Sequence, residues 1–155
     1  MRDKRFVAEH RGGPLNIVQH RQLIIWASAC AEHVLPLLGE NIDDRLVYAL
    51  LIAREWEKDK VTVGYAMKAS QGAHTVARES SDPVKIAVAR AIGHAVATAH
   101  MADHSLGSAL YALKAVKITG NSIDQERKWQ NDYLPFEIRE LILSAMVNKE
   151  IHFKI

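Results

Sequence analysis

The feature that most constrains the fold is an alanine-rich run that begins at Pro83. Asp82 before this proline provides a helix start, an N-cap followed by proline at the first helical position. A helix that is apolar all round must be buried all round, and small side chains let its neighbours approach closely. We therefore predict a central helix over residues 83–104 with other helices packed around it. The small residues that fall on all its faces are Ala87, Ala89, Ala91, Gly93, Ala95, Ala97 and Ala99.

The rest of the chain also shows helical patterns that are separated by short turns. Asn16 with Gln19 three residues later is typical of a capping box, and Asn41 is the expected N-cap of the next helix. Pro135 interrupts the last long pattern, whose apolar face we assign to Phe136, Ile138, Leu141, Ile142 and Ala145. A chain of 155 residues is long enough to bury one core. These patterns predict an all-α fold, a compact single-domain bundle of about six helices.

The two ends of the chain are expected to differ from the bundle. Residues 1–14 read as an irregular arm that closes at Gly12, Gly13 and Pro14. Residues 149–155 include a short apolar alternation like that of a strand, so we expect a tail that frays or docks in extended form. The predicted domain is thus residues 1–155, with the arm at 1–14 and the tail at 149–155.

Composition argues against several classes of protein. The single Cys30 cannot form an internal disulfide, which is typical of a reducing compartment. The first residues lack the apolar segment of a secretory signal, and the longest apolar run is broken by Arg90 and His94, so no membrane span is predicted. The formal net charge is +2, with no basic stripe interleaved with aromatic residues, which does not favour nucleic acid. We expect a cytoplasmic protein without a membrane partner.

Three polar residues in the predicted central helix invite a metal hypothesis. His100, Asp103 and His104 stand at i, i+3 and i+4, and on one helix face they could bind zinc or iron in a metal-dependent hydrolase. In an unbroken helix, however, His94 would lie far round from Asp103, and the sequence supplies no further ligand and no Glu-x-x-His motif. We favour hydrogen-bonded core polarity and predict no metal and no other cofactor; the hydrolase stays open as the alternative.

Charged residues on the small-residue helices form a further constellation. Arginines there can reach carboxylates across a bundle in bidentate pairs, which would fix the register of the helices. The same groups could instead line a polar pocket, but we favour the structural role. The predicted structural polar core consists of Arg54, Glu55, Arg78, Glu79, Arg90, His94 and Asp103.

Residues 99–115, which read AHMADHSLGSALYALKA, resemble the characteristic motif of a family of bacterial immunity proteins, the group-five-like immunity domain of polymorphic toxin systems. Residues 93–98, 30–36 and 53–56 are similar to the same family, so the resemblance covers most of the chain. It implies a protein that binds a cognate toxin and neutralises it without catalysis. No toxin-contact residue carries over, so the motif transfers as a determinant of the fold.

The resemblance implies a protein toxin as partner, and the slightly basic chain favours an acidic or neutral toxin over a strongly basic one. Exposed Trp, Tyr and Arg are the usual anchors of binding energy, so we predict toxin contacts at Arg5, Trp129 and Tyr133. Besides the hydrolase, a small-molecule or nucleic-acid binding module remains an alternative function, and a homo-oligomer is left open.

Overall fold

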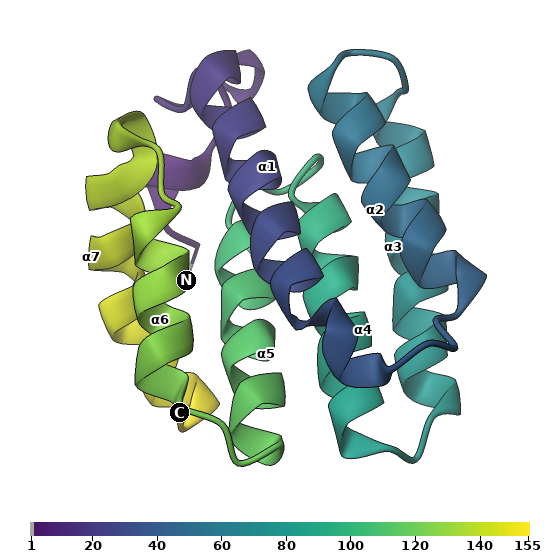
Figure 1. Cartoon of the computed structure of the whole chain (residues 1–155). Coiled ribbons are helices and arrows are strands. Elements are labelled where there is room, and N and C mark those ends of the chain that lie inside the picture. The colour runs from purple at the N-terminus through teal and green to yellow at the C-terminus, as the bar shows by residue number, and fades with distance from the viewer. Residues whose placement is uncertain (1) are drawn as a thin grey trace.

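Helices account for nearly all of the computed structural model, which describes residues 2–155 (Figure 1). The prediction of an all-α fold is confirmed, but residues 2–155 contain seven α-helices rather than six, and no strand beyond one isolated bridge between Ala8 and Leu15. Three short 3-10 helices are η1 (Lys4–Phe6), η2 (Glu9–Arg11) and η3 (Leu35–Leu38). The α-helices are α1 (Ile17–Val34), α2 (Asp44–Glu57), α3 (Val63–Glu79), α4 (Pro83–Ala97), α5 (His104–Ile118), α6 (Ile123–Asp132) and α7 (Phe136–Phe153).

Two helices, rather than one, occupy the centre of the bundle. Helix α4 packs against α1, α2, α3 and α5, whereas α5 packs against α1, α4, α6 and α7. Figure 1 shows α2 and α3 on one side of this pair and α6 and α7 on the other. The core also has two parts. One apolar cluster contains residues of all five helices from α1 through α5, and a second contains residues of the N-terminal arm, α1, α5 and α7.

Capping side chains explain where the helices begin. The Asn16 side chain accepts from the Gln19 backbone N–H and the Gln19 side chain bonds back, so the predicted capping box is confirmed. Asp82 accepts from the Val84 N–H ahead of α4, as the Asp-Pro pattern indicated. Asp43, not Asn41, caps α2, because its carboxylate accepts from the backbone N–H two residues later.

Helix α4 ends at Ala97, so the prediction of one helix through residue 104 is wrong. The Thr98 hydroxyl donates to the His94 carbonyl at 3.0 Å, and His20 of α1 donates from Nε2 to the Thr98 carbonyl at 2.6 Å. That carbonyl is therefore occupied by α1 instead of by the next turn of its own helix. The chain turns through residues 98–103, and α5 then runs back beside α4.

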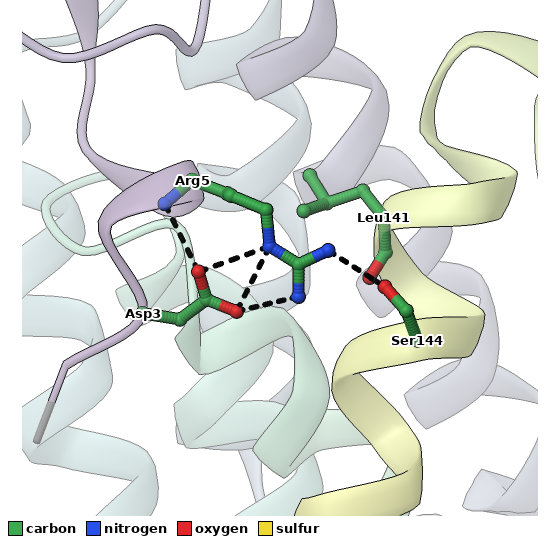
Figure 2. Close-up of polar contacts among 4 residues, drawn as sticks. All are labelled: Asp3, Arg5, Leu141 and Ser144. Atoms are coloured by element: carbon green, nitrogen blue, oxygen red, sulfur yellow. Dashed lines mark hydrogen bonds and ion pairs between the residues drawn. The ribbon is translucent and has the colours of Figure 1, made fainter.

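Both ends of the chain are more ordered than predicted. The arm folds back on itself, since the Leu15 N–H donates to the Val7 carbonyl, and its Phe6 side chain is completely buried. The Arg5 guanidinium is held between Asp3 and Ser144 of α7 (Figure 2). At the other end, residues 149–153 continue α7 as helix, which corrects the prediction of a frayed or extended tail.

Candidate functional site: a histidine cluster where α4 meets α5

Three imidazoles gather where α4 meets α5: His74 of α3, His94 of α4 and His104 of α5, here called the histidine cluster. The ring of His100, in the turn before α5, lies beside His104 but is not part of this cluster. The Nδ1 atoms of His94 and His104 are 2.9 Å apart, a hydrogen-bond distance. The ring centroids of His74 and His94, and those of His100 and His104, are 5.3 Å apart. The expectation that His94 stands alone is wrong, because it assumed an unbroken helix and α5 instead doubles back.

Two glycines make room for these rings. A Cβ atom on Gly93 would lie 2.7 Å from the His74 imidazole, and one on Gly107 would lie 2.9 Å from Nδ1 of His94. Any larger residue would push into a ring, so the two glycines and two histidines are packing partners. The glycines that mark the family-like motif therefore have a steric reason, which the sequence alone did not give.

The cluster is neutral at physiological pH. Burial is the largest cause that lowers the pKa of His94, to about 3, and of His74, to about 4; nearby positive charges lower both further. Burial also lowers the pKa of His104, against the opposing charge of Asp103. Arg90 donates from Nη1 to Nδ1 of His74 at 2.7 Å, which requires an unprotonated Nδ1. The cluster is thus a set of neutral rings that bond to their neighbours.

The predicted metal ligands do not form a metal site. His100 and Asp103 precede α5, so they do not share a helical face with His104. Among residues 2–155, no group of three or more His, Cys, Asp or Glu side chains is arranged to hold a metal ion. Lys149 lines the cavity of about 260 Å³ beside His94 and His104, and its positive charge opposes a cation there. The described residues therefore do not supply the ligand set that the hydrolase alternative assumed at His100, Asp103 and His104.

The predicted structural polar core is mostly at the surface. Arg54 is exposed and pairs with Glu32, while Arg78 and Glu79 are exposed at the end of α3. Glu55 is half-buried and reaches only Lys60, at 4.0 Å. These pairs lie at or near helix ends, where side chains extend into water. Arg90, His94 and Asp103 do lie half-buried near the junction of α4 and α5.

Sequence reasoning did not identify His74 or Tyr111 as members of this site. His74 lies on α3, with only α4 between it and the motif at residues 99–115. Tyr111 stacks on His94 with ring centroids 5.3 Å apart. The only trace of these contacts in the sequence is the presence of Gly93 and Gly107 among larger residues. Which ring each glycine accommodates becomes clear only when the packing of the helices is known.

Of the three predicted toxin-contact residues, two come together. Trp129 is half-buried and stacks between His33, with ring centroids 3.7 Å apart, and Tyr133, at 4.5 Å. Tyr133 is 57 % exposed, and Phe136, the first residue of α7, is 88 % exposed. Trp129, Tyr133 and Phe136, which follow one another from α6 into α7, are here called the aromatic ridge. Assigning Phe136 to the apolar inner face of α7 was therefore wrong. Arg5 contacts α7 at Ser144 instead of this ridge.

The comparison with family models identifies the class of protein. A family described as "Imm-5 like putative immunity protein" matches residues 13–137, which is most of the chain. The chain belongs to this Imm-5 like immunity protein family. Neither the curated proteins nor the solved structures include a match. None of the helices in residues 2–155 is both long and apolar enough to cross a membrane.

Proposed function

We propose that this protein binds a cognate protein toxin in the cytoplasm and blocks it by stoichiometric association, without catalysis. Membership of the immunity protein family over residues 13–137 is the observation that carries this proposal. The chemistry of the interior agrees with a binding role. The histidine cluster is neutral and bonded within itself, and burial raises the pKa of the Cys30 thiol, so neither offers an activated nucleophile.

The aromatic ridge is the proposed contact surface for the toxin. Large aromatic side chains bring much contact area for few rotatable bonds, which is why Trp and Tyr dominate binding energy at interfaces. Trp129 is already fixed by stacking on His33, so binding would lose little side-chain freedom there. Arg5 is proposed as a peripheral contact, since Asp3 and Ser144 already hold its guanidinium.

The first test is to look for a toxin-like gene beside the gene for this protein and to co-express the two products. We expect the protein to restore growth and to form a one-to-one complex with the toxin in size-exclusion chromatography. Failure of both rescue and complex formation with neighbouring toxin candidates would overturn the proposal.

The second test measures the interface by calorimetry. Tyr133→Ala and Phe136→Ala are each expected to weaken the Kd by about tenfold or more, as truncated anchors do. Tyr65→Ala on α3 is the matched control, because Tyr65 is 55 % exposed but lies outside the ridge. Equal losses in all three variants, or none, would remove the ridge from the interface while leaving toxin binding itself untouched.

A further inference from the structure

The N-terminal arm closes a second cavity of about 260 Å³ against α1, α2, α3 and the turn between α4 and α5, here called the arm pocket. We propose that the arm pocket binds a small oxyanion, a phosphate or carboxylate group, independently of toxin binding. Its lining residues are Arg2, Phe6, Ala8, His10, Arg11, His20, Trp56, Val63, Ala99, His100 and Ala102.

The lining combines positive charge with an apolar base. Two arginines and three histidines contribute its polar groups, and none of the Asp and Glu residues in the described chain lines it. Phe6, Ala8, Ala99 and Ala102 are buried and form the apolar part. Cationic donors that converge above a buried apolar surface favour the binding of an anion, because each donor gains a charge-assisted hydrogen bond.

The positive groups crowd one another without a full counter-charge. Burial lowers the pKa of His100; the positive charges of Arg11 and Arg2 lower it further, whereas the negative charge of Asp103 raises it. The carboxylate against them belongs to Asp103, whose Oδ2 lies 3.9 Å from Nε of Arg2, too far for a hydrogen bond. An anion in the pocket would relieve this like-charge repulsion.

Three buried polar atoms near the turn lack a hydrogen-bond partner among the described residues: Nε of Arg2, Nδ1 of His100 and Oδ1 of Asp103. The first two belong to residues that line the arm pocket, whereas Asp103 does not line it. A buried polar atom without a partner is costly, and in native structures it calls for an explanation such as a bound ion. An oxyanion in the pocket would accept from Arg2 and His100, since its oxygens carry several lone pairs. The pocket therefore has unused binding capacity, unlike the histidine cluster.

Size and shape restrict the ligand. A cavity of about 260 Å³ is below the usual range for drug-sized ligands, so a phosphate, a small phosphomonoester or a short dicarboxylate fits better than a nucleotide. Trp56 and His20, with ring centroids 4.8 Å apart and ring planes tilted by 54°, both line the pocket. Arg2 and Arg11 lie before the family match, which begins at residue 13.

The test titrates the full chain with inorganic phosphate and, separately, with succinate and acetate, by calorimetry at constant ionic strength. We expect saturable binding of at least one anion and shifts of the His100 ring signals in NMR spectra. A preference for phosphate would point to a phosphate ester as the natural ligand, and a preference for succinate would point to a carboxylic acid.

Three arginine variants test whether the anion binds in the arm pocket. Arg2→Met and Arg11→Met should each weaken the Kd by about tenfold, because each removes a charge-assisted donor. Arg139→Met on α7 is the matched control and should bind like the unaltered protein, since Arg139 lies outside the pocket. The proposal is overturned if no anion binds saturably, or if all three variants bind alike, which would indicate a general salt effect.

Discussion

The histidine cluster and the arm pocket both lie at the turn between α4 and α5, but their polar atoms differ in hydrogen bonding. In the cluster, His94 bonds to His104, and Arg90 donates to His74. In the arm pocket, Arg2 and His100 keep buried atoms without partners. Polar atoms that are bonded to one another stabilise a fold, whereas polar atoms left without partners indicate where a ligand belongs.

The two regions also differ in what surrounds them. The cluster is enclosed by α3, α4 and α5, within the part of the chain that matches the family. The arm pocket is closed by residues 2–11, which lie before that match and are attached to α7 through Arg5 and Ser144. The residues of the cluster thus lie within the family match, whereas the arm that closes the pocket lies before it. If the two regions differ as their bonding indicates, they should also differ in how much they contribute to stability.

The largest expected loss of stability comes from adding a methyl group next to the rings of the cluster. Gly93→Ala and Gly107→Ala should each lower the free energy of unfolding by about 1–3 kcal/mol, because the new methyl group would overlap an imidazole. Gly72→Ala is the matched control: its Cβ would meet nothing within 4 Å on α3, so alanine should raise stability by up to about 1 kcal/mol. Urea denaturation measures all three, and equal values would mean that the rings simply move aside.

Which helix boundaries could be predicted from the sequence depends on how far apart in the chain the interacting residues are. Helix starts such as those at Asn16 and Asp82 were predictable, because a cap and its partner lie within three residues of each other. The end of α4 was not, because it depends on His20 of α1 reaching the Thr98 carbonyl. Periodicity within residues 83–104 contains no information about a donor on another helix.

The candidate sites show the same limit. Trp129 and Tyr133 share a helical face at i, i+4, so their contact followed from local spacing. Surface positions such as Arg54 and Glu79 were misassigned, because an Arg or Glu at a helix end looks the same in sequence whether a neighbour covers it or not. The arm pocket required five segments to meet, and the apparently irregular arm gave no sign of closing a cavity.

A smaller effect is expected from acid. In the unfolded chain the histidines titrate near 6.5, whereas in the fold the pKa of His74 is about 4 and that of His94 about 3. The unfolded state therefore binds more protons below pH 6.5, so the stability that these groups contribute is complete above that pH and is lost as the pH falls toward 4 and then 3. The melting temperature should fall between pH 7.5 and pH 5.

A variant and its control assign this pH dependence to the cluster. His94→Gln should flatten the curve of melting temperature against pH, because glutamine does not titrate. His152→Gln should leave the slope unchanged, since His152 is exposed on α7. If His152→Gln flattens the curve as much as His94→Gln does, the acid sensitivity belongs to surface charge rather than to the buried rings.

The smallest expected effect compares the two regions most directly, because it compares the loss of one arginine from each region. Arg90→Met should lower the free energy of unfolding by about 1 kcal/mol, since it leaves Nδ1 of His74 half-buried without its donor. Arg11→Met should change it by less than about 0.5 kcal/mol, because the Arg11 side chain makes no hydrogen bond to the described residues and lies among other positive groups. Urea denaturation without added anions measures both, and adding the anion that binds should stabilise Arg90→Met more than Arg11→Met, whose Kd for the anion is expected to be weaker. Equal losses would show that the arginines of the arm pocket are as structural as Arg90, and the distinction between the two regions would fail.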